Sequence, residues 1–359
     1  MNLVHIHNRY ETFINDVLLD ADGLLRSFLN LHTLRPWTNE ELKPYDLTFI
    51  CQNSPDPAGC LTYENSLMAT GEYALSQVVR HQATGEGLEA ARRGCEAILK
   101  VASEGAHYMP GHLPKPFRGL SHARDSHEIS PDQYIKVILA LHGYRHYADE
   151  TTRKRIDAFF MDVADFFVAR KFRHAYRHRT IVTAQTHIHA LSLYLPILVL
   201  AGNISGEAKY HNELKQFDEV IDTLPQRPQF DSYNKLSLLA EGFHLALSEG
   251  HDDRRLRDAI GSLWKTGVDF TDKRHDRSER TRLGGFAGIV HAYFPEWHAL
   301  EECRVILAKF DDPADLPTTT TEDETALPLT HRYLPHTHCE AAATSWLLAY
   351  WRMHLAQQS

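Results

Sequence analysis

The spacing of apolar residues in one long stretch constrains the fold of this chain most strongly. In TTRKRIDAFFMDVADFFVARKF, residues 151–172, apolar side chains recur every three or four positions, which places them along one face of an α-helix. They are Ile156, Phe159, Phe160, Val163, Phe166 and Phe167. The polar residues between them fall on the opposite face, so we expect a helix that covers a core on one side and meets water on the other.

Other segments have a second kind of helical pattern. Residues 131–148 and 183–201 are apolar on almost every side, as expected of helices buried on all faces. The helices that we predict span residues 63–83, 87–103, 131–148, 151–172, 183–201, 206–222, 233–249, 252–270, 284–293, 297–309 and 339–356, with another within 9–31. Sustained strand-like alternation is missing, so the fold class is all-α.

The helices tend to pair through short turns, and buried helices alternate with amphipathic ones. This pattern predicts an (α/α)6 toroid of six helical hairpins, in which the apolar helices form the inner ring. We expect one domain over residues 1–359, with the N-terminal segment 1–60 packed on the toroid. An α-solenoid is the structural alternative, but the sequence has no repeat of the length that a solenoid would require.

The composition disfavours several classes of protein. The net charge of −9 disfavours a general nucleic-acid binder. Five cysteines in 359 residues are no disulfide scaffold, and we expect free thiols even at Cys51 and Cys60, which bracket a short loop and could pair.

No leader pattern is visible, which predicts a cytoplasmic protein, or a periplasmic one if a leader was trimmed. The longest apolar stretch, ALSLYLPILVLAG, is shorter than the ~18 residues of a membrane span and contains Pro196, so we expect no membrane partner.

Titratable residues are concentrated in GLSHARDSHEISPDQY, residues 119–134, directly before a predicted core helix. We predict Asp132, Asp125 and Glu128 as catalytic residues, and we expect His122, Arg124 and His127 to line the substrate site. In a toroid, a loop here would deliver carboxylates to the mouth of the barrel. Ser130 followed by Pro131 predicts a helix N-cap with proline at the first helical position. An acidic residue in the first turn also favours the helix dipole, whether or not it has a function.

Carboxylates at a concave site suit the cleavage of glycosidic bonds, where one protonates the leaving oxygen and another activates water or attacks the sugar. Candidates for the second carboxylate are Glu64, Asp231, Glu241 and Glu340. Further side chains expected to contact a sugar are Tyr63, Tyr134, Arg282 and His338. Aromatic rings stack on sugars, and Arg282, in a basic stretch before a Gly-Gly pair, could hold a uronic acid carboxylate.

His336, His338 and Cys339 form an H-x-H-C stretch before a helix, and these residues could bind Zn²⁺ with a partner from elsewhere in the chain. No second cysteine-rich motif completes such a site. We therefore expect no metal and no cofactor.

Three stretches resemble the six-hairpin glycosidases. They are TYENSLMATGEYALSQVVRHQATGE, SPDQYIKVILALHGYRHYADE and HCEAAATSWLLAYWRM, and the resemblance extends over residues 60–356. Within that superfamily the chain looks most like the unsaturated uronyl and rhamnogalacturonyl hydrolases. The resemblance implies an oligosaccharide substrate and an Asp that protonates the vinyl ether of a Δ4,5-uronide before water adds. Asp132, in the S-x-D-Q-Y unit, is the residue that matches.

We therefore predict a carbohydrate-active enzyme that cleaves a glycosidic bond in an oligosaccharide, with uronic-acid-containing oligosaccharides among the candidate substrates. The first alternative is a polysaccharide lyase on the same toroid, with Tyr or His as the base. The second is a toroid that binds sugars or a protein without catalysis, and the third is a metal-dependent enzyme that uses His338 and Cys339.

Overall fold

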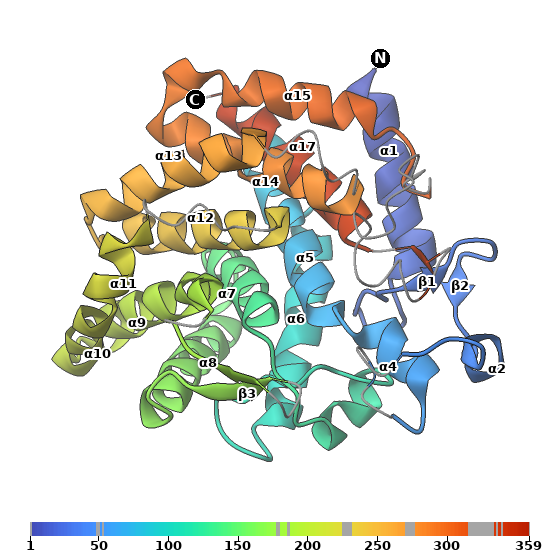
Figure 1. The fold of residues 1–359 in the computed structure, drawn as a ribbon, viewed down its shortest axis with the longest axis horizontal. Coiled ribbons are helices and arrows are strands. Elements are labelled where there is room, and N and C mark those ends of the chain that lie inside the picture. Colours follow the sequence, from blue (N-terminus) through green and yellow to red (C-terminus); the bar gives the residue numbers. More distant parts are fainter. Residues whose placement is uncertain are drawn as a thin grey trace.

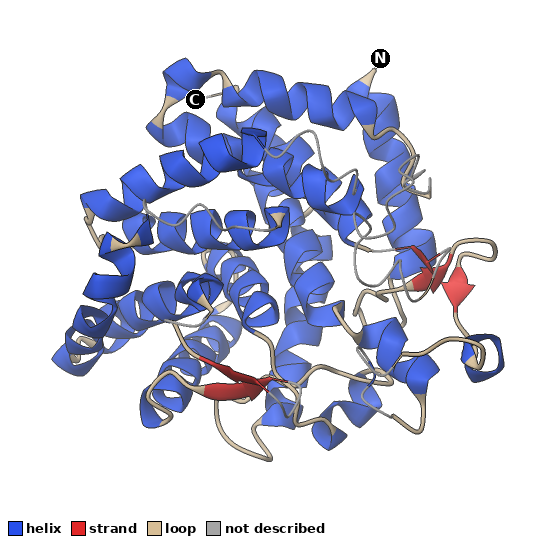
Figure 2. Cartoon of the chain, in the orientation of Figure 1, coloured by secondary structure: helices blue, strands red, loops and turns tan. Residues whose placement is uncertain are grey.

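The computed structural model describes residues 2–47, 51, 54–176, 180–184, 187–224, 232–269, 277–314, 334, 337–338 and 340–358. Helices dominate this part of the chain (Figure 2), as the sequence predicts. The α-helices are α1 (Leu3–Phe13), α2 (Asn39–Leu42), α4 (Pro57–Tyr63), α5 (Ser66–Thr84), α6 (Leu88–Gly105), α7 (Pro131–Arg145), α8 (Glu150–Ala169), α9 (Leu191–Ser205), α10 (Ala208–Leu214), α11 (Asp218–Asp222), α12 (Tyr233–Ser248), α13 (Arg254–Asp269), α14 (Arg277–Tyr293), α15 (Ala299–Lys309) and α17 (Ala341–Ala356).

Five short strands accompany the helices in the described residues. β1 (Leu29–Asn30) lies between β2 (Arg35–Pro36) and β5 (Thr337–His338) in a small antiparallel sheet. β3 (His174–Tyr176) and β4 (Thr180–Val182) form a hairpin. The sheet joins the N-terminal segment to the residues just before α17, which are more than 300 positions away in the sequence.

Six long helices, here called the central helices, pack against one another in sequence order (Figure 1): α5, α7, α9, α12, α14 and α17. Each contacts the next, and α17 contacts α5. The remaining long helices each lie against one or more of the central helices: α6 on α5, α8 and α10 on α9, α13 on α12, α15 on α14 and α1 on α17. The two kinds of helix therefore occupy different positions, which agrees with the two apolar patterns in the sequence.

Burial explains these patterns. Every residue of α9 from Leu191 to Gly202 is buried, whereas α8 buries only the apolar face that the sequence predicts. Residues Ile188–Ser205 form one helical stretch that could cross a membrane by its length and composition, and 72% of it is buried inside the protein. Such burial is typical of a core helix. The stretch is nonetheless longer than the sequence suggested, because Pro196 lies within α9 without ending it.

Several predicted boundaries are wrong. The helix predicted within 9–31 begins earlier, at Leu3, and α1 ends at Phe13; one π-helical turn follows, and the Asp20 carboxylate then accepts the Leu24 N–H in a tight turn. The helix predicted over 183–201 begins later: a 3₁₀ turn spans Ile188–Ala190, and α9 starts at Leu191. The helix predicted over 206–222 breaks into α10, a 3₁₀ turn and α11.

Two glycines let central helices approach closely. A Cβ atom on Gly242 of α12 would overlap the backbone of Ser192 in α9. A Cβ atom on Gly71 of α5 would lie 2.7 Å from the backbone oxygen of Lys136 in α7. Both contacts require a residue with no side chain, because the neighbouring atoms are backbone atoms that cannot rotate away.

The thiols of Cys51, Cys60, Cys95 and Cys303 are free and buried, which confirms the expectation for Cys51 and Cys60. The neighbouring Cys51 thiol and burial raise the pKa of Cys60, so this thiol is an unreactive core group.

Candidate functional site

The candidate site lies where the central helices begin, and its centre is the first turn of α7. Pro131 occupies the first helical position, as predicted. Ser130 is the N-cap residue, but its side chain does not bond the helix backbone as the prediction required. Its Oγ donates instead to Oδ1 of Asp132, which also accepts the Gln133 N–H at 2.9 Å. Within the part of the chain that the structure describes, Oδ2 of Asp132 makes no hydrogen bond.

A buried ion cluster fixes the segments around Asp132. The Nζ atom of Lys115 lies 2.5 Å from Oε1 of Glu64 and 2.9 Å from Oε1 of Glu128. The three side chains are only 2%, 4% and 10% exposed, respectively. Breaking such a buried pair by removing one partner is costly, because the remaining charge stays in a poorly solvating environment. This cluster therefore holds the loop of residues 115–128 firmly against the junction of α4 and α5.

A second contact attaches α7 to the same junction. The side chain of Gln133 donates from Nε2 to the backbone oxygen of Glu64 at 2.7 Å. The backbone N–H of Lys115 also donates to the oxygen of Glu128 at 2.8 Å. The structure therefore brings Glu64 and Glu128 together and places the neighbour of Asp132 against them.

The other predicted residues of the loop lie apart from this cluster. Asp125 pairs with Arg118 at 2.9 Å and with His122 at 3.3 Å, and all three side chains are well exposed. Arg124 pairs with Glu104 at 2.9 Å. These ion pairs form a surface patch on the 3₁₀ turn Leu120–Asp125. His127 is also outside the cluster; its ring lies 4.8 Å from the ring of Tyr108.

Tyr134, which we predicted to contact the substrate, lies in the core. Tyr134 is fully buried, and its hydroxyl donates to the Gly111 oxygen at 2.8 Å and accepts the Leu113 N–H at 2.7 Å. The hydroxyl of Tyr63 donates to Asp20 at 3.0 Å. Burial and the Asp20 charge raise the pKa of Tyr63 to about 12. Both hydroxyls thus anchor loops.

Arg282 and His338 are buried near the start of α14 and before α17. Arg282 is 6% exposed, and its Nη1 contacts Oδ1 of Asn234 on α12. His338 lies in β5, with Nε2 2.8 Å from the Pro313 oxygen. Of the predicted second carboxylates, Glu340 is the buried N-cap residue of α17, and Asp231 lies outside the described residues.

His336 and Cys339 of the H-x-H-C stretch also lie outside the described residues. Among the residues that are described, no group of three or more His, Cys, Asp or Glu side chains could hold a metal ion.

A second buried ion network lies between the central helices, and the sequence reading did not foresee it. Nζ of Lys136 lies 2.8 Å from Glu72 and 2.6 Å from Glu241, and all three side chains are at most 2% exposed. Arg352 extends the network, with Nη1 2.6 Å from the other oxygen of Glu241. Thr344 and Ser345 donate to Glu72 at 2.6 Å and 2.8 Å.

The alternating charges explain how this network is tolerated. Burial alone would raise the pKa of Glu72, but the charges of Lys136 and Arg282, with hydrogen bonds from Lys136 and Thr344, outweigh it and lower the pKa to about 2. The sequence did carry a signal. A lysine inside a helix that is apolar on every side must have a buried partner, because an unpaired buried charge is too costly.

No protein-family model, curated protein or solved structure matches this chain.

Proposed function

We propose that the six central helices form the inner ring of an (α/α)6 toroid and that the outer helices surround them. The unbroken series of contacts from α5 to α17, and the return contact from α17 to α5, support this arrangement. Residues from the second halves of five central helices line one common pocket, which suits helices that run in the same direction. Their first turns then share the opposite end of the ring, where Asp132 lies.

We propose that the protein is a carbohydrate-active enzyme that cleaves a glycosidic bond in an oligosaccharide. One observation carries this proposal: half-buried Asp132 presents an oxygen that no described residue hydrogen-bonds, while buried polar contacts fix the segments on either side of it. A catalytic carboxylate needs this combination, since it must be held in place and still reach a substrate oxygen.

In the proposed reaction Asp132 transfers a proton to the leaving oxygen, or to the vinyl ether carbon of an unsaturated uronide. The partial positive charge at the start of α7 would stabilise the carboxylate that results. Glu64 and Glu340, at the starts of α5 and α17, are candidates for the carboxylate that directs water. Lys115 and Glu128 would act as positioning residues.

A uronic acid in the substrate would be recognised by Arg282. Its guanidinium contacts Asn234 near the start of α12 and Met68 near the start of α5, and guanidinium groups bind carboxylates through two parallel hydrogen bonds. Asn234, which contacts Arg282, would orient it.

The test is to incubate the wild type and Asp132→Asn with saturated and Δ4,5-unsaturated oligosaccharides, following reducing ends and the ultraviolet absorbance of the double bond. If the wild type removes the double bond and Asp132→Asn does not, the result would support uronyl hydrolysis. New reducing ends without an absorbance change would indicate an ordinary glycosidase.

Two other results would replace the proposal. A rise in absorbance on saturated uronides would indicate a lyase, with a Tyr or His as the base. Sugar binding without turnover by the wild type would indicate a non-catalytic binding protein.

A further inference from the structure

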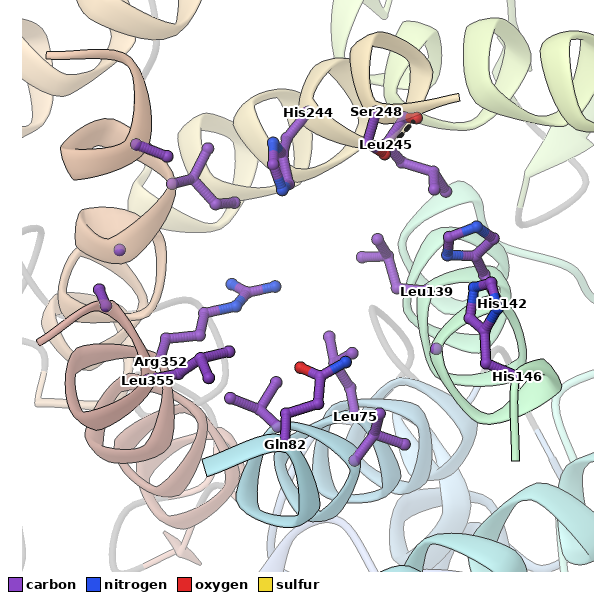
Figure 3. A pocket seen from close by; sticks show the side chains of 17 residues that line it. Leu75, Gln82, Leu139, His142, His146, His244, Leu245, Ser248, Arg352 and Leu355 are labelled. Atoms are coloured by element: carbon purple, nitrogen blue, oxygen red, sulfur yellow. Dashed lines mark hydrogen bonds between the residues drawn. The ribbon is translucent and has the colours of Figure 1, made fainter. Parts of the chain in front are cut away.

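A pocket of about 360 Å³ opens at the end of the central helices opposite Asp132 (Figure 3). It is lined by residues from the second halves of α5, α7, α12, α14 and α17. Its walls are mainly apolar, with side chains such as Leu75, Val79, Ile289 and Leu355. Its volume falls within the range of small-molecule sites, which is about 300–1,000 Å³.

The side chain of Arg352, in the last turn of α17, points into this pocket and brings a cationic group to it (Figure 3). Its Nη1 atom donates to Oε1 of Glu241 at 2.6 Å and to the Gly285 oxygen at 2.8 Å. In the described part of the chain, its Nε and Nη2 atoms make no hydrogen bond. The guanidinium is therefore held rigidly at one nitrogen and keeps two donor nitrogens for a ligand.

His244 of α12 points into the pocket from the side facing Arg352 (Figure 3). Its Nδ1 lies 2.9 Å from the hydroxyl of Tyr293. Burial and the charge of Arg352 lower the pKa of His244 to about 4, so the ring is neutral at pH 7. When the tyrosine hydroxyl donates to Nδ1, Nε2 carries the proton and is a second donor for a ligand.

We propose that this pocket binds a monocarboxylate with an apolar body, such as an aryl- or alkyl-substituted acid. The carboxylate would accept hydrogen bonds from Arg352 and His244, and the apolar body would pack on the leucine, isoleucine and valine walls. Two nearby carboxylates are already bound by other side chains. Oε1 of Glu249 lies 2.7 Å from Nε2 of His142, and Glu241 is shared by Lys136 and one nitrogen of Arg352.

The helix ends themselves oppose an anion, because their carbonyl groups carry partial negative charge. The effect of a helix terminus on a nearby charge is small at most exposed sites. Hydrogen bonds to a charged group are among the strong ones, and the planar guanidinium can make two to one carboxylate. The donors of Arg352 and His244 therefore favour a carboxylate, and they offer nothing to an ammonium group. This inference does not depend on the proposed function, which concerns the other end of the ring.

The probe is 3-phenylpropanoate, titrated into the full-length protein by isothermal calorimetry at pH 7. We expect saturable binding of one molecule per chain. The neutral 3-phenylpropanamide should bind at least ten-fold more weakly, and 3-phenylpropylamine should not compete. Equal binding of acid and amide, or tighter binding of the amine, would overturn the assignment of a carboxylate.

Variants locate the site. Arg352→Gln should weaken binding of the acid at least ten-fold, whereas Arg153→Gln, an exposed arginine on α8, should leave it unchanged. Because Arg352 also pairs with Glu241, Ala292→Trp provides a second test that fills the pocket without removing a charge. Unchanged affinity in Ala292→Trp would overturn the proposal even if Arg352→Gln failed to fold.

Discussion

Lys136 of α7 and Glu241 of α12 form an ion pair 2.6 Å long, and each side chain is only 1% exposed. The pair bridges two central helices through the middle of the helix assembly. Because Glu72 contacts the same ammonium from α5, a single lysine holds three helices in register.

The first prediction concerns that lysine. Lys136→Met should lower the free energy of unfolding by about 3–5 kcal/mol, because Glu72 and Glu241 then remain buried near one another without a shared cation. Urea denaturation measures the change. Lys154→Met is the matched control: its pair with Glu150 is exposed, so its loss should cost less than about 1 kcal/mol. Equal effects of the two variants would contradict the role of the network.

A pH dependence follows from Glu72. Its pKa falls from the ordinary 4.5 to about 2 in the folded protein. A carboxylate with a depressed pKa stabilises the fold above the unfolded pKa, and this stabilisation is lost as the pH falls from about 4.5 towards 2. At pH 7 the free energy of unfolding should therefore be higher for the wild type than for Glu72→Gln, by a few kcal/mol. This gap between the two proteins should shrink below pH 4.5. A gap that stays constant from pH 7 to pH 3 would refute this.

The contact between α9 and α12 provides a packing test. Gly242→Ala should destabilise the protein by about 1–3 kcal/mol, because the new Cβ would overlap the backbone of Ser192. Gly285→Ala, on α14, is the control, since nothing lies within 4 Å of its Cβ position. That variant should be neutral or more stable by up to about 1 kcal/mol, because alanine favours the helix. Thermal unfolding of both variants distinguishes the two cases.

His244 should titrate far below an ordinary histidine. Burial and Arg352 lower its pKa to about 4, so its ring signals in an NMR titration should shift near pH 4. Arg352→Gln should raise that midpoint by removing the neighbouring charge, and Arg153→Gln should not move it. A midpoint near 6.5 in the wild type would mean that the ring is solvated.

The sequence predicted much of the helical architecture, because apolar spacing depends mainly on which face of a helix is buried. The pattern of Phe159, Phe160 and Phe167 therefore placed α8 correctly. Apolar spacing did not predict the structure where local hydrogen bonds determine the backbone conformation. The Asp20 turn after α1 and the β3–β4 hairpin before α9 leave no periodic signal.

Site residues were harder to predict, since partners of a charged residue can come from anywhere in the chain. Clustering in sequence suggested that Asp125, Glu128 and Asp132 act together. In the folded protein Glu128 joins Lys115 and Glu64, whereas Asp125 lies on the surface. Tyr134 was predicted to contact a sugar as an aromatic residue beside a loop, and in the folded protein it is fully buried.

The most direct test of the proposed function compares initial rates of wild type, Asp132→Asn and Asp258→Asn on the best oligosaccharide found in the substrate panel. Asp258 is an exposed residue of α13, so its variant controls for the loss of one carboxylate. The proposal predicts at least a 100-fold lower rate for Asp132→Asn, as expected when a general acid or base is removed, and an unchanged rate for Asp258→Asn. Equal rates for all three proteins would contradict a catalytic role for Asp132.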